Sequence, residues 1–186
     1  MAETLVAAIV QARMGSSRLP GKVLMPLAGK PVLWHVIHRL RKCRLVQRIV
    51  IATSDRLSDD PLAEFADEQD VELVRGSEDN VLQRFALAAR QIGPDVMVRV
   101  TGDAPLIDPV TLDLFISRLN SEHADYCTSD PSPPRAIHEG FCTFTRNAFE
   151  RLLQEAPDDP AAREHITAYF KEHPESYRIA YQPKDP

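Results

Sequence analysis

The sequence has few cysteines and no long hydrophobic run, and each absence excludes a class of protein. Its 186 residues include three cysteines, Cys43, Cys127 and Cys142, which lie far apart and form no C-x-x-C pair. An odd number of separated cysteines argues against a disulfide framework and a structural zinc, and favours the reducing cytoplasm. No apolar run approaches the ~20 residues that span a bilayer, so no membrane partner is expected. The apolar stretch Leu5–Val10 follows an acid, Glu3, which is not typical of a signal peptide.

The net charge is small but unevenly distributed along the chain. The 22 Lys and Arg residues against 27 Asp and Glu residues give a net charge of −5. Residues 1–48 carry nine of the cations and one acid, and the rest of the chain carries 13 cations and 26 acids. Such an asymmetry can indicate an anionic partner. Nucleic acid is not the expected partner, because no aromatic residues are interleaved with these cations and the body is acidic.

Strand-like and helix-like segments alternate over the first two thirds of the chain, which predicts an α/β fold. Strands are expected at Leu5–Gln11, Arg48–Thr53, Val71–Val74 and Asp95–Val100, and helices at Pro31–Leu40, Leu62–Gln69, Val81–Gln91 and Pro109–Leu119. Strands separated by helices of this length pair in parallel through right-handed crossovers. We therefore expect a Rossmann-like, mostly parallel sheet with helices on both faces.

The pattern becomes mixed beyond residue 120. Strands are expected at Ala124–Thr128, Phe141–Thr145 and Tyr177–Tyr181, helices at Ala148–Gln154 and Ala161–Lys171, and a Pro-rich loop at Pro131–Pro134. A chain of this length is by default one domain. The expected organisation is a single domain over residues 1–186, with an α/β half at 1–120 and a smaller mixed part at 121–186.

Three loops are expected at the carboxyl ends of the parallel strands, where open α/β sheets bind their ligands. They are Ala12–Lys22, Arg75–Arg84 and Thr101–Asp108. We call Ala12–Lys22 the phosphate loop, because it combines three cations, two serines and two glycines within a few residues. Glycines let backbone N–H groups approach an anion, and Arg and Lys bind phosphate oxygens. This composition favours a triphosphate over the alternative of a solvated surface loop.

The spacing of the phosphate loop matches neither common phosphate-binding motif. A Walker A loop has four residues between its glycines and a Ser or Thr after its Lys. Here five residues separate Gly15 from Gly21, and Val23 follows Lys22. The loop does not have the G-x-G-x-x-G spacing of dinucleotide-binding proteins either.

Asp103 follows the fourth expected strand and is the candidate metal ligand. Mg²⁺ commonly takes one or two carboxylates together with substrate phosphates and water. A carboxylate just past a strand end, beside a phosphate loop, suits that arrangement. The alternative is that Asp103 is only a turn residue or helix cap, and Asp108 before Pro109 is expected to be such a cap.

Four segments together resemble a known family. They are IVQARMGSSRLPGKVLMPLAGKPVLWHVIHRL, RGSEDNVLQRF, RVTGDAPLIDP and REHITAYF, in this order along the chain. The run resembles the sugar cytidylyltransferases, in particular the spore-coat polysaccharide biosynthesis group, which is related to the 3-deoxy-manno-octulosonate and acylneuraminate cytidylyltransferases. The resemblance covers about residues 5–180. It implies a fold of the nucleotide-diphosphosugar transferase type and a homodimer.

The resemblance also implies a reaction and a set of site residues. The reaction transfers CMP from CTP to a sugar, releases pyrophosphate and uses Mg²⁺. By position, Gln11 and Ala12 would lie near the base, and Asp79, Val81 and Arg84 near the base or ribose. Arg13 and Lys22 would hold the triphosphate, while Gly15, Ser16 and Arg18 would shape the loop. Asp103 would bind the metal, and Glu164 and His165 would face the sugar. Catalysis would depend chiefly on Arg13, Lys22 and Asp103.

Two departures from the family pattern leave alternatives open. Members usually supply a second metal-binding Asp from a VDTPED-like segment, which this sequence lacks, and Gly140–Phe144 lacks the acids often found there. Glu139 or another acid could substitute, or Asp103 and the phosphates could hold the metal alone. The sequence could also be a shortened form, or it could have lost activity. The second hypothesis is therefore a non-catalytic nucleotide- or sugar-binding protein on the same fold.

Overall fold

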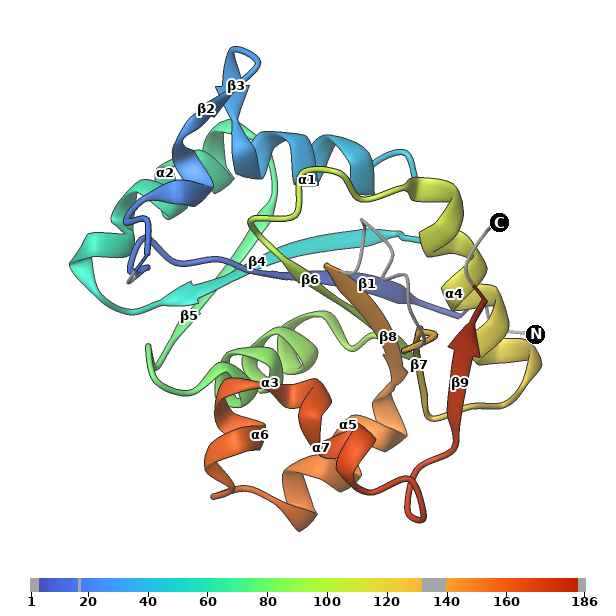
Figure 1. The fold of residues 1–186 in the computed structure, drawn as a ribbon. Coiled ribbons are helices and arrows are strands. Elements are labelled where there is room, and N and C mark those ends of the chain that lie inside the picture. Colours follow the sequence, from blue (N-terminus) through green and yellow to red (C-terminus); the bar gives the residue numbers. More distant parts are fainter. Residues whose placement is uncertain (1–3, 17, 132–139, 184–186) are drawn as a thin grey trace.

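Seven strands form one mixed sheet through the middle of the molecule (Figure 1). The computed structural model describes residues 4–16, 18–131 and 140–183. The sheet order is β5-β4-β1-β6-β8-β7-β9, with bounds β1 Val6–Gln11, β4 Arg48–Ser54, β5 Glu72–Gly76, β6 Val96–Thr101, β7 Tyr126–Ser129, β8 Phe141–Thr145 and β9 Ile179–Gln182. The first four strands in this order are mutually parallel, and β8 runs antiparallel to β6 and β7. The expected α/β class and the mixed character after residue 120 are both confirmed.

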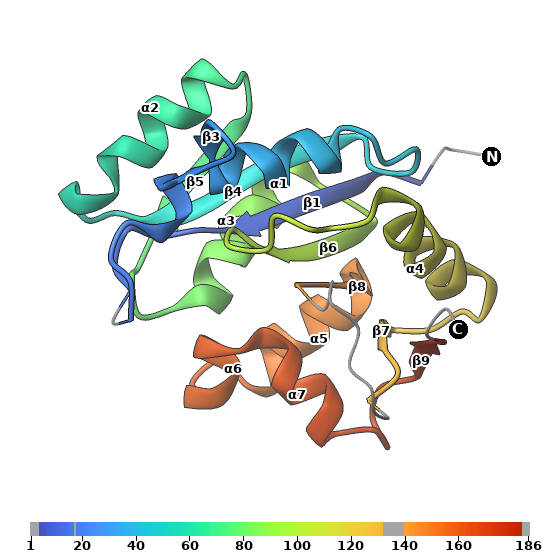
Figure 2. The same ribbon diagram turned by 45° about the horizontal axis from the view of Figure 1, so that its top comes forward.

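Helices cover both faces of the sheet, as Figure 2 shows from a second direction. Their bounds are α1 Val32–Leu40, α2 Asp60–Glu68, α3 Val81–Ile92, α4 Pro109–Ser121, α5 Arg146–Glu155, α6 Pro160–Glu164 and α7 Ile166–Glu172, with short 3₁₀ turns η1 Lys22–Leu24 and η2 Leu57–Asp59. Helices α1, α2 and α4 pack on one face, and α3, α5, α6 and α7 pack on the other. None of the helices in the described residues is long and apolar enough to cross a membrane.

Strand β1 lies at the centre of the sheet and explains why the run after Leu5 is continuously apolar. Residues 7–10 are completely buried, because Ala8 and Val10 face one helical layer while Ala7 and Ile9 face the other. A strand buried on both faces loses the alternation of apolar and polar residues seen in half-exposed strands. Its carboxyl end at Gln11 therefore opens into the phosphate loop at the middle of the sheet edge (Figure 1).

The sequence prediction was wrong in two places. Ala161–Lys171 is not one helix, because the backbone leaves the helical region at His165, with φ −132° and ψ 79°, and separates α6 from α7. Glu164 and His165 are exposed, so no core packing holds them in a helix. A small hairpin of β2 (Pro26–Leu27) and β3 (Lys30–Pro31) was not expected at all.

Most other boundaries differ from the expected ones by one or two residues, the usual scatter at element ends. Strand β5 ends at Gly76 where Val74 was expected, and α5 begins at Arg146 where Ala148 was expected. Of the expected Pro-rich loop, residues 132–134 lie outside the described residues.

All three cysteines are free, and all three are buried. Burial raises the pKa of Cys43 and of Cys127 to about 12, and it also raises the pKa of Cys142. Because the thiolate is the reactive form, we expect none of the three to react with iodoacetamide at pH 8 in the folded protein. Mass spectrometry should detect three adducts only after denaturation. Rapid modification of the native chain at any one cysteine would contradict this burial.

Candidate functional site

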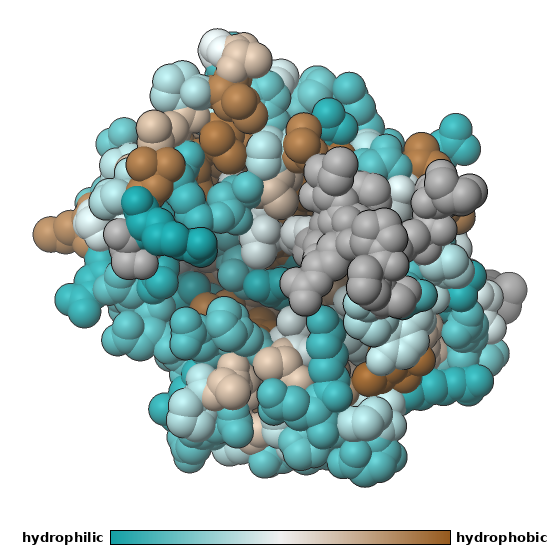
Figure 3. All heavy atoms as spheres, viewed as in Figure 1, coloured by the Kyte–Doolittle hydropathy of each residue, from teal (hydrophilic) through white to brown (hydrophobic). Residues whose placement is uncertain are grey.

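A cavity of about 540 Å³ lies at the carboxyl edge of the parallel strands. Three segments far apart in the sequence line it. They are Gln11, Ala12 and Arg13 at the carboxyl end of β1, Glu78, Asp79, Val81 and Arg84 before and at the start of α3, and Pro160, Arg163, Glu164 and His165 of α6 and its end. Figure 3 shows this face of the molecule, where hydrophilic side chains predominate around a hollow above α3 and α6. The volume is in the range of small-molecule sites.

Eight of the residues singled out in the sequence line this cavity. They are Gln11, Ala12, Arg13, Asp79, Val81, Arg84, Glu164 and His165. The residues expected near the base and those expected near the sugar therefore line the same cavity. They come together because α3 and α6 pack in the same hydrophobic cluster on one face of the sheet. The individual roles of these residues remain predictions. Gly15, Ser16, Arg18, Lys22 and Asp103 do not line the cavity and lie on the phosphate loop or after β6.

The phosphate loop is closed by a backbone hydrogen bond between its two halves. The N–H of Gly21 donates to the carbonyl oxygen of Met14 at 2.8 Å. Gly21 has φ +72°, a left-handed conformation that glycine adopts without strain, and Lys22 follows as the first residue of η1. Arg18 is exposed and Ser16 is partly exposed, so both side chains can reach a ligand. The loop thus presents its cations at the sheet edge without any glycine-rich motif of known spacing.

Lys22 and Asp103 are 81 residues apart in the sequence and form an ion pair. Partial burial alone would raise the pKa of Asp103, but the hydrogen bond and the positive charge of Lys22 outweigh it and hold the pKa below its usual value. The two side chains remain about one third exposed, 32% and 38%. Asp103 is therefore an ionised, reachable carboxylate directly beside the phosphate loop.

Gly102 allows the loop after β6 to approach the phosphate loop this closely. Its N–H donates to the carbonyl oxygen of Gln11 at 2.9 Å. A Cβ at this position would lie 2.9 Å from the Cβ of Ala12, which is closer than real Cβ contacts. A glycine is thus required where the two loops cross, and Asp103 follows it immediately.

Asp103 is the only acid of the expected metal site that the structure places. No group of three or more His, Cys, Asp or Glu side chains that could hold a metal occurs within residues 4–16, 18–131 and 140–183. One ionised carboxylate fits a Mg²⁺ that arrives with the triphosphate and takes its other ligands from phosphate and water, but it does not fit a resident ion held by protein alone. The alternative acid, Glu139, lies outside the described residues.

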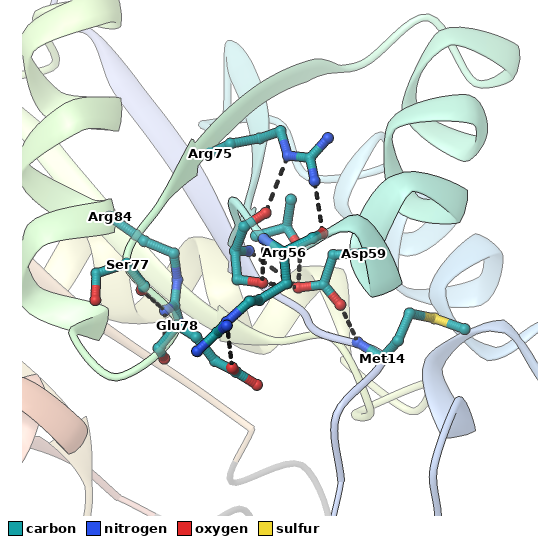
Figure 4. A network of polar contacts seen from close by, with 9 residues as sticks. Met14, Arg56, Asp59, Arg75, Ser77, Glu78 and Arg84 are labelled. Atoms are coloured by element: carbon teal, nitrogen blue, oxygen red, sulfur yellow. Dashed lines mark hydrogen bonds and ion pairs between the residues drawn. The ribbon is translucent and has the colours of Figure 1, made fainter.

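Asp59 is a site residue that the sequence analysis missed. Its carboxylate is 1% exposed and lies between the end of β4 and the phosphate loop (Figure 4). It accepts hydrogen bonds from the N–H of Met14, the hydroxyls of Thr53 and Ser54, and the N–H of Ser54. Burial alone would raise the pKa of Asp59, but these hydrogen bonds outweigh it and lower the pKa. The only signal in the sequence was an acid close after a buried strand.

A second polar network holds the loop between β5 and α3 (Figure 4). The guanidinium of Arg84, which is 3% exposed, donates to the carbonyl oxygens of Ser77 and Glu78 at 2.5 and 2.9 Å. The Nε of Arg84 has no hydrogen-bond partner within the described part of the chain. Burial and the nearby charge of Arg13 lower the pKa of Arg84. Two cations thus meet at the cavity wall, which favours an anionic ligand.

Two further residues of this region were not anticipated. Arg75 bridges the loops after β4 and β5, donating to the carbonyl oxygens of Ser54 and Arg56 and to the carboxylate of Asp60. Arg163 lines the cavity from α6 and pairs with Asp158. Each arginine is the first residue of a segment that carries the family resemblance, but only the folded arrangement shows what its side chain contacts.

Comparisons with known proteins agree with this geometry. A family model for cytidylyltransferases matches residues 7–185. The chain is 38% identical over 180 residues to the spore coat polysaccharide biosynthesis protein SpsF of Bacillus subtilis, covering 93% of this chain and 72% of that protein.

Solved structures give the same result. A cytidylyltransferase from Leptospira borgpetersenii superposes with a TM-score of 0.89 at 32% identity, covering 98% of this chain and 77% of that one. A CMP:2-keto-3-deoxy-manno-octonic acid synthetase complexed with CTP superposes with a TM-score of 0.76 at 18% identity, covering 97% and 90%, and shows the shared fold. The match of the family model to nearly the whole chain confirms the resemblance found in the sequence: this chain belongs to the cytidylyltransferase family.

Proposed function

We propose that this chain transfers CMP from CTP to a sugar and releases pyrophosphate, as a step in the synthesis of a surface polysaccharide. The observation that carries the proposal is the Lys22–Asp103 pair beside the phosphate loop, next to a cavity of nucleotide size. Membership of the cytidylyltransferase family and the 38% identity to a spore coat polysaccharide biosynthesis protein support it.

The cavity supplies the binding half of this function. The base and ribose of CTP would lie between residues 11–13 and the start of α3, where Asp79, Val81 and Arg84 line the wall. The triphosphate would extend from Arg13 along the phosphate loop to Lys22. The Lys22 side chain is partly exposed, so its ammonium group can contact the phosphates. Arg and Lys suit phosphate oxygens as forked and point-charge partners.

The chemistry then requires positioning and charge neutralisation. A sugar oxygen attacks the α-phosphorus of CTP, the bond to the β-phosphate oxygen breaks, and pyrophosphate leaves. Lys22 and Arg13 offset the negative charge that grows on pyrophosphate, which is the largest contribution expected from side chains in such transfers. Mg²⁺ held by Asp103 and the phosphates would supply further charge stabilisation. The sugar would enter from the side of Glu164 and His165. The homodimer that the sequence resemblance implies stays a prediction.

The test is release of pyrophosphate with CTP, Mg²⁺ and a panel of sugars, with UTP and ATP as competing nucleotides. We expect release with CTP and at least one sugar, and tighter binding of CTP than of UTP or ATP. No release with any sugar, together with a CTP-dependent rise in Tm, would favour the binding protein as the function. Equal binding of the three nucleotides would overturn the assignment to cytidine.

A further inference from the structure

We propose that Asp59 is a positioning residue that holds the phosphate loop in its nucleotide-binding conformation before any ligand arrives. The proposal rests on the proposed function, because it explains how that site is held ready. It is based on the two carboxylate oxygens of this buried side chain, one of which binds the end of β4 and the other the phosphate loop. Asp59 itself need not touch the nucleotide, so it would act through the backbone of Met14.

The two oxygens of Asp59 serve different parts of the chain. Oδ2 accepts from the Thr53 hydroxyl at 3.0 Å and from the Ser54 N–H and hydroxyl at 3.1 and 2.5 Å. All three donors belong to the end of β4, a strand inside the sheet. Oδ1 accepts from the N–H of Met14 at 2.7 Å, in the phosphate loop. The rigid strand end thus fixes the carboxylate, and the carboxylate fixes the loop.

Met14 is held on both sides of its backbone. Its N–H donates to Asp59, and its carbonyl oxygen accepts from the N–H of Gly21. The next two backbone N–H groups, those of Gly15 and Ser16, have no acceptor in the part of the chain that the structure describes. Successive free N–H groups on a fixed backbone form a favourable site for phosphate oxygens. Asp59 therefore determines where these two donors point.

A carboxylate so close to a phosphate site would repel the ligand if it were exposed and free. Asp59 is 1% exposed and its charge is distributed over four donors. It also lies close enough to Arg84 for the two charges to attract each other. Hydrogen bonds of this kind stabilise a buried carboxylate and strengthen in a low dielectric. The arrangement gains precise loop geometry without presenting a negative surface to the triphosphate.

The experiment compares Asp59→Asn with two matched controls in the full chain. The amide introduced by this substitution keeps one acceptor oxygen, but its NH₂ group replaces the other. That NH₂ group then faces N–H and O–H donors of Met14 or of Thr53 and Ser54 and cannot accept from them. Asp60→Asn changes the neighbouring acid, which pairs with Arg75 and accepts from none of the four donors that bind Asp59. Leu62→Ala removes a fully buried side chain of α2 and lowers stability, but it takes away none of the hydrogen bonds to Asp59. A stability-matched control is needed because any loss at Asp59 would also loosen the turn before α2.

Two readouts separate positioning from a merely structural role. In the nucleotide-free protein, hydrogen exchange of the amides of residues 14–16 should become about tenfold faster in Asp59→Asn and stay unchanged in both controls. The Kd for CTP should rise about tenfold or more, the effect of losing one charge-assisted hydrogen bond, while the KM for the sugar stays within about twofold. Asp59→Glu, which keeps the charge but displaces it, should not restore CTP binding.

The outcomes distinguish this proposal from the function on which it rests. If the unsubstituted protein binds CTP and Asp59→Asn binds it equally well, the positioning role is wrong. The positioning role is also wrong if Leu62→Ala weakens CTP binding as much as Asp59→Asn does. If the unsubstituted protein binds no CTP, the proposed function fails instead. Should Asp59→Asn not fold, Ser54→Ala removes one supporting hydroxyl and should give a smaller change in the same direction at residues 14–16.

Discussion

Replacing Lys22 by methionine is expected to lower kcat for CMP transfer by about 10²–10³-fold, the usual cost of removing one preorganised electrostatic group from a reacting centre. The ammonium group lies at the end of the phosphate loop and pairs with Asp103, so it is placed where pyrophosphate charge would develop. Methionine keeps the length and packing of the stem and removes only the charge. The measurement is the rate of pyrophosphate release at saturating CTP with the sugar that supports turnover.

Lys30→Met is the matched control for Lys22→Met. Lys30 is an exposed lysine on the β2–β3 hairpin, where its ammonium lies 5.7 Å from the ring centre of Trp34. The Lys30→Met variant should lose less than about twofold in rate, because Lys30 contributes only a distant, screened charge to the site. If Lys22→Met retained more than a tenth of the activity, Lys22 would not stabilise the leaving group, and Arg13 would become the principal candidate.

Replacing Asp103 by asparagine is expected to lower kcat by about 10³-fold, and raising the Mg²⁺ concentration should not restore it. The structure offers one ionised carboxylate at this place, and no cluster of acids among the described residues could take over its role. A metal ion supplies several kcal/mol of charge stabilisation in phosphoryl-group chemistry, which is why the expected loss is large. The measurement is pyrophosphate release across a Mg²⁺ titration.

Asp67→Asn, an exposed acid on α2, is the control and should behave like the unsubstituted protein. CTP binding measured without metal should tighten by no more than a few-fold in Asp103→Asn, because the substitution frees Lys22 while the other nucleotide contacts lie on other loops. Full activity of Asp103→Asn at ordinary Mg²⁺ would remove it as the metal ligand. The double variant Lys22→Met with Asp103→Asn should lose less than the product of the two single losses, because contacting residues are not additive.

The central half of the fold follows from the sequence because its signals are local and strong. β1 is a continuous apolar run, and such a run bounded by a loop is typical of a strand buried on both faces. The meeting of Lys22 with Asp103 follows from topology, since β1 and β6 are parallel neighbours and their carboxyl ends share one edge. A rule about strand ends therefore brought together two side chains that no short motif connects.

Other features could not be read from the sequence, for reasons that differ from residue to residue. Asp59 works through hydrogen bonds to a loop 45 residues away, and hydropathy carries no information about such partners. His165 interrupts a stretch whose composition suits one helix, and only the backbone angles of the structure show that two helices meet there. Arg163 and Arg75 have long, common side chains whose direction only the fold determines.

The contact between Lys22 and Asp103 also has a thermodynamic consequence. A phosphate that recruits the lysine and a divalent cation that recruits the carboxylate must each break the same ion pair. The ligand that binds first bears the free-energy cost of breaking the pair. The second ligand then binds a side chain that is already free of its ion-pair partner. The two binding equilibria are thus linked with positive sign, and by reciprocity each raises the affinity for the other by the same factor. Since the pair is about one third exposed, the factor is modest, on the order of a few-fold. In the absence of nucleotide, the lysine acts as an internal counter-ion that keeps the carboxylate from retaining a cation.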